Sequence, residues 1–466
     1  MLHHSASMDT IIAPATPSGE GAIGIIRLSG AQAIPLCDVF FRGRKPLNAV
    51  KTHTLHYGHL YEGERLLDEV VVSVFKGPRS YTGEDVVEIS CHGSSYILSE
   101  VMQAFMRQGA RMATPGEFTQ RAFFNGRLDL SQAESVADII ASENAAQHQL
   151  AFSQMRGGYT DVLQNLRNEL ITFAGLIELE LDFSQEDVAF ADRSALQTLL
   201  ARIQQTLHQL IKSFQLGNVL KKGIPVAIIG EPNVGKSTLL NALLNEEKAL
   251  VSDIAGTTRD VIEDVLTIEG IAFRFLDTAG LRETDDVLEA RGIARSYEKM
   301  KTARVILYLV DSGTSSSEIR QRFTELNLLE EQTAMLVLNK ADLMPVQALQ
   351  DLLAELKRDL SANVYAISAK ANTDIQGIRK ALVDWVHHHP YQQQGMIVSN
   401  VRHLEALQHT QEAVTAIQQG IESNLTGDLL AIDIRMALHH LGTITGQVEI
   451  DRDILGTIFS KFCIGK

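Results

Sequence analysis

The chain has 466 residues, of which 45% are hydrophobic, and this length favours roughly two to four globular domains. It contains no run of about 18 or more apolar residues, and residues 1–18 lack an apolar signal-peptide core, so we expect no membrane span and no secretion. The three cysteines are sparse, which indicates a reducing cytoplasm. The net charge is −15 and no region is basic, which argues against a protein that wraps nucleic acid mainly by neutralising phosphates.

Residues 9 to about 120 mix strand and helix patterns and predict an α+β domain. Strands are expected over 10–13, 23–28, 69–75 and 85–90, and a helix over 94–107. Arg27 and Glu88 are charged residues within otherwise apolar strands. Because buried charges need partners or ligands, these two either bind a ligand, form an internal ion pair, or lie on an exposed edge strand.

The region from about 121 to 216 shows long helical periodicity with few strand formers. Ser131 and Glu134 have capping-box spacing and predict a helix N-terminus at Ser131. Further helices are expected over 194–216, 400–423 and 428–440. Helices on both sides of the middle of the chain indicate a domain inserted into a helical one, with its ends near Gly217 and His387 close together.

The middle of the chain holds a phosphate-binding motif. Residues 230–237 read G-x-x-x-x-G-K-S, after the apolar run 225–229 and before the helical pattern 238–244. Backbone N–H groups of such a loop cradle phosphates at a helix N-terminus. Lys236 adds a positive charge for the β- and γ-phosphates, and Ser237 can ligate Mg²⁺.

Four more motifs follow in the order of a GTP-binding domain. They are the switch threonine region 257–260, D-T-A-G at 277–280, N-K-x-D at 339–342 and S-A-K at 368–370. The carboxylate of Asp342 can accept from the ring N–H and the amine of guanine, a donor pair that adenine lacks, so we expect GTP rather than ATP. Asp277 fits the Mg²⁺ side of the site, and Gly280 fits the γ-phosphate side.

One position departs from the commonest GTPase chemistry. Leu281 stands where many GTPases have a glutamine that orients the attacking water. Another polar group must act instead, and most of the nearby charges are expected to be solvated. These nearby residues are Arg282, Glu283, Asp285, Asp286 and Glu289.

The chain ends in Phe462-Cys463-Ile464-Gly465-Lys466. Lys461 and Lys466 flank Cys463, and neighbouring lysines favour the reactive thiolate. The alternative is an inert terminal cysteine.

Together these features resemble the MnmE (TrmE) family of tRNA-modification GTPases, over nearly the whole chain. The most specific element is the ending at 462–466. The other matching segments are 13–17, 26–30, 81–85, 115–123 and 128–134.

The resemblance implies a multidomain fold. It has an N-terminal α+β domain for folate binding and dimerisation (1–120), an all-α helical-bundle domain in two parts (121–216 and 386–466), and an inserted Ras-like α/β P-loop GTPase domain (217–385).

The resemblance also implies functional residues. A reduced folate, 5,10-methylenetetrahydrofolate or a 5-formyl analogue, is expected at Arg27, Glu88, Arg127 and Lys466. Some relatives have lysine at Arg127, which keeps the charge but changes the geometry. The water-orienting residue falls on Glu289, and Cys463 matches the important cysteine of the family. The GTPase domains of this family pair across the nucleotide and use K⁺ in place of an arginine finger, at Asn233, Ser252, Ile254 and Thr257.

The resemblance further implies residues that contact GTP and residues that hold magnesium. The GTP-contacting residues are Asn233, Val234, Gly235, Lys236, Ser237, Thr238, Ser252, Asp253, Ile254, Ala255, Gly256, Thr257, Thr258, Asp277, Thr278, Ala279, Gly280, Asn339, Lys340, Ala341, Asp342, Ser368, Ala369 and Lys370. The magnesium ligands are Ser237 and Thr258.

The reaction implied by the resemblance is addition of an aminomethyl-type (carboxymethylaminomethyl) group at C5 of the wobble uridine, U34, of certain tRNAs. A homodimer would act in a heterotetramer with the FAD-binding MnmG (GidA) protein, and FAD would sit only in that partner. The alternatives are a ribosome-assembly GTPase of the Era or Der type and a membrane-remodelling GTPase. The first resembles 217–380 only and usually adds a basic RNA-binding domain, and the second needs a basic amphipathic stretch that the chain lacks.

Overall fold

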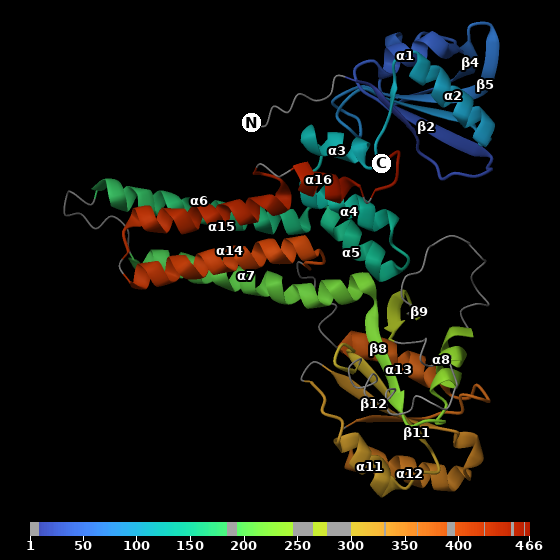
Figure 1. The fold of residues 1–466 in the computed structure, drawn as a ribbon, viewed down its shortest axis with the longest axis vertical. Coiled ribbons are helices and arrows are strands. Elements are labelled where there is room, and N and C mark those ends of the chain that lie inside the picture. The colour runs from blue at the N-terminus through green and yellow to red at the C-terminus, as the bar shows by residue number, and fades with distance from the viewer. Residues whose placement is uncertain are drawn as a thin grey trace. The chain divides into compact units, whose positions relative to one another are not determined.

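The computed structural model describes residues 9–183, 193–245, 264–276, 300–329, 332–360, 362–388, 397–423, 425–448, 452–460 and 462–466. The chain divides into two compact units (Figure 1). The first comprises Met1–Ala141, Ala151–His208 and Glu405–Lys466, and the second comprises Ser142–Leu150 and Gln209–Leu404.

A seven-stranded sheet opens the first unit, in the order β3-β4-β5-β6-β2-β1-β7. Its strands are β1 (Ile11–Pro14), β2 (Ile23–Ser29), β3 (Phe41–Gly43), β4 (Thr54–Glu62), β5 (Arg65–Phe75), β6 (Val86–His92) and β7 (Arg111–Met112). All neighbouring pairs are antiparallel except β1 and β7. The four strands predicted for this region are present, with ends shifted by a few residues.

The two faces of this sheet differ. Helices α1 (Ala33–Phe40) and α2 (Ser95–Arg107) cover one face, and the one-turn η1 (Leu47–Ala49) adds to the same core. Because strand side chains alternate, Ile26 and Leu28 enter that core while Arg27 between them points to the opposite face. Helix α3 (Glu117–Phe124) contributes Phe118 on that second face, where the ring lies near Arg27.

Helices make up the rest of the first unit. They are α4 (Leu130–Ile140), α5 (Ala145–Met155), α6 (Gly158–Phe183), α7 (Arg193–Lys222), α14 (Val401–Glu422), α15 (Gly427–Thr445) and α16 (Arg452–Phe459). Three of these helices, α5, α7 and α14, have residues in both units. Figure 1 shows α6 alongside α15 and α7 alongside α14. Segments far apart in the sequence therefore share one helical bundle, as its two-part pattern predicts.

The start of α4 corrects the predicted cap. The helix begins at Leu130 and its N-cap is Asp129, not Ser131. Asp129 Oδ1 accepts from the backbone N–H of Gln132 (2.8 Å), and Gln132 Oε1 accepts from the backbone N–H of Asp129 (3.0 Å). Ser131 instead donates its hydroxyl to Asp129 Oδ1 (2.7 Å). The capping-box prediction was wrong by two residues because D-x-x-Q caps as well as S-x-x-E.

The second unit contains a six-stranded sheet in the order β13-β12-β11-β8-β10-β9. Its strands are β8 (Ile224–Gly230), β9 (Asp264–Ile268), β10 (Ile271–Phe275), β11 (Val305–Asp311), β12 (Thr333–Asn339) and β13 (Asn363–Ala366). All neighbours are parallel except β9 and β10. This is the α/β architecture predicted for a Ras-like domain, and each motif-bearing strand predicted from the sequence is present.

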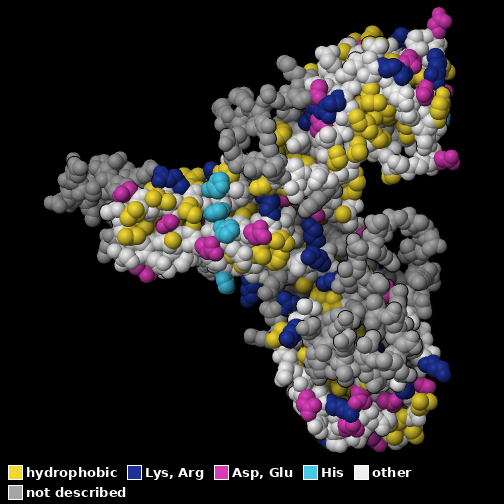
Figure 2. Space-filling model, in the orientation of Figure 1, with side chains coloured by type: hydrophobic (Ala, Val, Ile, Leu, Met, Phe, Trp, Pro, Cys, Tyr) yellow, Lys and Arg dark blue, Asp and Glu magenta, His cyan; other side chains and the backbone are white. Residues whose placement is uncertain are grey.

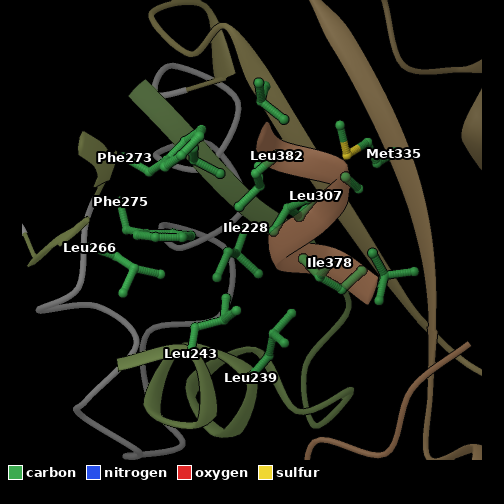
Figure 3. Close-up of a cluster of buried hydrophobic side chains, with 14 of the residues drawn as sticks. Ile228, Leu239, Leu243, Leu266, Phe273, Phe275, Leu307, Met335, Ile378 and Leu382 are labelled. Carbon is green, nitrogen blue, oxygen red and sulfur yellow. The ribbon is translucent and has the colours of Figure 1, made fainter. Parts of the chain in front are cut away.

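Helices cover both faces of this sheet. Helices α8 (Lys236–Asn245) and α13 (Ile375–His388) pack on one face. Figure 3 shows this core, in which Leu239 and Leu243 of α8 and Leu382 of α13 join one cluster with strand residues such as Ile228 and Phe273. Helices α11 (Ser316–Thr324) and α12 (Val346–Asp359) pack on the other face, and the short η2 (Ala341–Leu343) follows β12. Strands buried on both faces read as continuous apolar runs, as β8 does.

The chain enters and leaves the second unit at neighbouring points. Helix α7 continues past the predicted end at Leu216 to Lys222. The backbone N–H of Val398 donates to Ser213 Oγ of that helix (3.0 Å), and Gly217 one turn on lies directly against Val398. Within the described residues, no helix is long and apolar enough to cross a membrane.

We predict that Gly217→Ala destabilises the second unit by about 1–3 kcal/mol. A Cβ on Gly217 would lie 2.0 Å from Val398 O, so the backbone of one segment must move. Gly377→Ala in α13 is the matched control, because a Cβ there meets nothing within 4 Å and alanine favours a helix. Denaturant midpoints of both variants would check this, and a Gly217→Ala protein as stable as Gly377→Ala would contradict it.

Candidate functional site

The loop between β8 and α8 has the backbone shape of a phosphate cradle. Positive φ angles occur at Gly230 (154°), Asn233 (62°) and Gly235 (94°). A Cβ on Gly230 would lie 2.1 Å from Leu309 O, and one on Gly235 would lie 2.4 Å from Asn339 Nδ2. Both glycines of the motif are therefore required by close packing as well as by conformation, and the loop opens into the N-terminus of α8.

Lys236 bends back over this loop. Its Nζ donates to Gly230 O (2.9 Å) and Glu231 O (2.7 Å). Burial lowers the pKa of Lys236, and the negative charge of Glu231 only partly opposes this. An ammonium that burial disfavours gains strongly from an anion, so the residue fits a phosphate ligand.

Asn339 joins three of the predicted motifs. It is 3% exposed, and its Nδ2 donates to Val234 O of the loop (2.7 Å). Its Oδ1 accepts from the backbone N–H of Ala369 in the S-A-K motif (3.0 Å). One buried amide thus fixes the phosphate loop against the segment predicted to support the base.

The remaining residues of the base-reading motif are ordered around it. Lys340 has a left-handed backbone (φ 60°), and its Nζ pairs with Asp311 Oδ2 (2.8 Å). Asp342 is exposed in η2, and its carboxylate has no hydrogen-bond partner among the described residues. Ser368 Oγ accepts from the backbone N–H of Ala371 (3.2 Å), which closes the following turn. A free carboxylate beside a rigid loop fits recognition of a guanine edge.

Several predicted residues lie outside the described residues, namely Ser252, Asp253, Ile254, Ala255, Gly256, Thr257, Thr258, Asp277, Thr278, Ala279, Gly280, Leu281 and Glu289. Of the predicted potassium and magnesium positions, Asn233 and Ser237 are described, on the phosphate loop and in the first turn of α8. The structure adds one contact that the sequence did not suggest: Arg322 of α11 forms an ion pair with Glu231 of the loop.

A second polar cluster lies in the first unit, on the open face of the seven-stranded sheet. Arg27 and Glu88 are opposite each other on the paired strands β2 and β6. The Nε and Nη2 atoms of Arg27 both contact Glu88 Oε1 (2.8 and 2.7 Å). Of the three alternatives that the sequence left open, the central strands exclude an edge-strand charge and the contact shows an ion pair, while ligand binding stays a prediction. Glu88 Oε2 has no hydrogen-bond partner among the described residues.

The chain terminus completes this cluster. Arg27 Nη1 donates to Gly465 O (3.1 Å), and the backbone N–H of Gly116 donates to Cys463 O (3.4 Å). The backbone of Gly465 is left-handed (φ 97°), and a Cβ there would lie 2.1 Å from Pro14 O. Burial lowers the pKa of Lys466, as does the nearby Arg27. The Cys463 side chain is exposed.

Two aromatic rings flank Arg27, and sequence reasoning did not find them. The Arg27 Cζ lies 5.6 Å from the ring centre of Tyr81 and 5.7 Å from that of Phe118. The Tyr81 hydroxyl lies 2.8 Å from Thr119 Oγ1. Arg127 is exposed, and it lies beside Gly83 in the loop that carries Tyr81. The structure therefore brings Arg27, Glu88 and Lys466 together. Arg127 lies beside the loop that carries Tyr81.

A network of charged residues, in which Glu117 and Arg121 are buried, supports that loop. Arg121 is 9% exposed and contacts Asp9 (2.9 Å), Glu84 (3.2 Å) and Glu117 (3.0 Å). Arg111 contacts Asp9 and Glu117, each at 2.5 Å. Glu117 and Arg121 are an i,i+4 pair on α3, which the sequence could suggest, but the contacts of Asp9 and Glu84 join segments far apart in the sequence and carry no local signal.

The strand order and the linked phosphate and base loops define a GTP-binding protein of the P-loop class. Comparisons with known proteins narrow this class. Residues 130–463 match the model of the MnmE helical domain, and residues 10–127 match that of the GTP-binding protein TrmE N-terminus. The chain belongs to the MnmE family of tRNA modification GTPases, and it is a GTP-binding and GTP-hydrolysing enzyme of that family.

Relatives of full length support this assignment. A protein of Flavobacterium johnsoniae named tRNA modification GTPase MnmE is 51% identical over 466 residues, covering 99% of this chain and 100% of the relative. One of Cytophaga hutchinsonii with the same name is 52% identical over 459 residues, covering 98% of each.

The solved FeoB G-domain from Methanococcus jannaschii is 26% identical, covers 35% of this chain and 98% of its own, and gives a TM-score of 0.25.

We predict that Asp342→Asn lowers GTP affinity by at least about tenfold and raises affinity for xanthosine triphosphate. The change exchanges a charged acceptor for an amide, and hydrogen bonds to charged groups contribute about 1.5–3 kcal/mol. Nucleotide titrations of wild type, Asp342→Asn and the exposed control Asp351→Asn in α12 would check this. Unchanged GTP affinity in Asp342→Asn would show that another residue reads the base.

Proposed function

We propose that this chain couples GTP hydrolysis to assembly of a carboxymethylaminomethyl-type group at C5 of the wobble uridine, U34, of certain tRNAs. It acts in the cytoplasm as a homodimer, in a heterotetramer with an FAD-binding partner of the MnmG (GidA) kind. The observation that carries the proposal is the Arg27–Gly465 contact. It ties the cysteine-bearing terminus to a charged pair on the first sheet, across 438 residues of sequence.

The cluster around Arg27 suits a reduced folate, which supplies a one-carbon unit when bound. Glu88 keeps one oxygen available to accept from the N–H groups of a pteridine, while Arg27 holds the other. Lys466 and Arg127 are cations without hydrogen-bond partners for their side chains among the described residues, and folate carries carboxylates that need such partners. Cys463 lies three residues from Lys466, so its exposed thiol belongs to the same segment.

The phosphate loop suits GTP with two kinds of cation. Ser237 would hold Mg²⁺ together with Thr258, and the exposed Asn233 would contribute to K⁺ binding together with Ser252, Ile254 and Thr257. K⁺ would supply the positive charge that an arginine finger supplies elsewhere. Glu289 would orient the attacking water, since Leu281 cannot.

The first sheet supports the proposed homodimer. Its open face exposes Leu55 (71%), Tyr57 (62%) and Val71 (36%), and Tyr57 and Val71 are opposite each other on β4 and β5. Figure 2 shows hydrophobic side chains gathered over this domain. A contiguous exposed apolar surface marks an interaction site, and a second copy of the same domain would cover it. In this proposal residues 1–120 dimerise and bind folate, 217–385 bind GTP, and 121–216 with 386–466 form the helical domain.

We predict that Arg27→Ala weakens binding of 5-formyltetrahydrofolate by at least about tenfold and leaves GTP hydrolysis within about twofold of wild type. Arg27 fixes Glu88 through charged hydrogen bonds, whereas the phosphate loop is in the other unit. Calorimetry with the folate and steady-state GTPase assays would measure both, with the exposed Arg42→Ala as control. Equal loss of both activities would assign Arg27 a structural role only.

We predict that Glu289→Ala binds GTP as wild type does but loses at least roughly tenfold in turnover, about 1.4 kcal/mol of transition-state stabilisation. Hydrolysis by wild type should require KCl, because Na⁺ is too small for the proposed cage, and Asn233→Ala should reduce the potassium response. Steady-state assays in equal KCl or NaCl would decide this. Equal wild-type rates in the two salts would refute the potassium site, and a fully active Glu289→Ala would make that residue a solvated charge.

A further inference from the structure

We propose that Tyr81 is a folate-binding residue, whose ring stacks on the flat pyrimidine half of the reduced pteridine. This inference rests on the proposed folate function and adds a residue that no sequence motif assigned to it. The first observation is a contrast in exposure along one loop. Ser80 is 7% exposed and Thr82 is 0% exposed, but Tyr81 between them is 36% exposed.

The loop is held rigidly, so the exposure of Tyr81 is built into the fold. Ser80 Oγ donates to Glu84 O (2.5 Å), and Thr82 Oγ1 lies 2.7 Å from Ser29 Oγ. Asn125 Nδ2 donates to Thr82 O (2.7 Å), and Ser29 Oγ donates to Glu84 Oε2 (2.7 Å). A ring on such a loop is already in place for a ligand and loses little freedom on binding.

The ring is also positioned against the charged pair. Its hydroxyl meets Thr119 Oγ1 (2.8 Å), and its centre lies 5.6 Å from Arg27 Cζ. Phe118 contacts the same guanidinium at 5.7 Å and is fully buried. Both rings therefore pack on Arg27, but Phe118 is fully buried whereas Tyr81 is also partly exposed and so can contact a ligand.

The chemistry of the neighbours selects the kind of ligand. The available Oε2 of Glu88 accepts hydrogen bonds, and an aromatic face accepts a flat conjugated ring. The pyrimidine half of a reduced pteridine combines both features, because it stays conjugated after reduction and carries N–H donors in its plane. The aminobenzoyl ring of folate is flat but carries no comparable set of donors, so the pteridine end is assigned to this position.

The test uses the full-length protein and (6S)-5-formyltetrahydrofolate. Tyr81→Leu should weaken binding on the order of tenfold, since stacking of a heterocycle on an aromatic side chain is of about this strength. Tyr81→Phe keeps the ring and should bind within about threefold of wild type. GTPase activity should not change in either variant. Tyr96→Leu, an exposed tyrosine on α2, is the matched control.

A second measurement reports stacking directly. The chain has a single tryptophan, Trp385, in the second unit. Tyr81→Trp should show fluorescence quenching by the folate beyond that of wild type, and Tyr96→Trp should not. A tetrahydropterin without the tail should compete for this quenching better than p-aminobenzoylglutamate.

The outcomes separate the two proposals. Wild type that fails to bind the folate would overturn the proposed folate function itself. Folate binding by wild type and by Tyr81→Leu with equal affinity would overturn only the role of Tyr81. Equal losses in Tyr81→Phe and Tyr81→Leu would assign the effect to the hydroxyl and its Thr119 contact, and would also overturn stacking.

Discussion

The structure of the first unit depends on how it satisfies the guanidinium of Arg27. A charge in the middle of a sheet is costly unless it is paired and hydrogen-bonded, and Arg27 is on a central strand. Glu88 supplies the counter-charge from the next strand, and Gly465 supplies a carbonyl from the end of the chain. The last residues therefore form part of the environment of this sheet, and a glycine is needed at Gly465 because its backbone passes so close to Pro14.

A comparable role in the second unit falls to the buried amide of Asn339. Its two hydrogen bonds use both ends of the side chain, one toward the phosphate loop and one toward the S-A-K segment. Removing the amide would leave a buried carbonyl and a buried N–H without partners, which is more costly than the bonds themselves are stabilising. The loop predicted to bind phosphate and the segment predicted to support the base are thus linked to each other through one side chain.

Most of the second unit could be predicted from the sequence because its signals are local. An apolar run, a glycine loop and a helical pattern follow one another at the phosphate loop, and β8 and α8 are where that order puts them. Helix ends were less predictable. Asp129 and Ser131 both suit an N-cap, and only the reciprocal bonds of Gln132 decide between them. Gly217 does not end α7, because its lack of a side chain serves contact with Val398 rather than helix termination.

The cluster around Arg27 was predictable only as far as the family resemblance names its residues. The periodicity of β2 shows that Arg27 is unusual, but its pairing with Glu88 depends on the register of strands 61 residues apart in sequence. Tyr81 and Phe118 lie in two of the segments that carry the family resemblance, but nothing in those segments indicates that the two rings flank Arg27. The charged network beside them is equally hard to predict, because its five groups come from four separate segments.

The charged network of Arg121, Glu84 and Glu117 holds the Tyr81 loop in place, and this support does not change near neutral pH. Burial alone would raise the pKa of Glu117, but hydrogen bonds from Arg111, from the backbone of Thr114 and from Arg121 outweigh it and hold the pKa below its usual value. A carboxylate with a lowered pKa in the folded state contributes stability above its unfolded pKa, about 4.3, and loses it only as the pH falls through the lower folded value. At neutral pH the carboxylate of Glu117 therefore stays charged. Breaking one partner would strand a buried charge, so the network keeps the loop, and with it the ring of Tyr81, in one position.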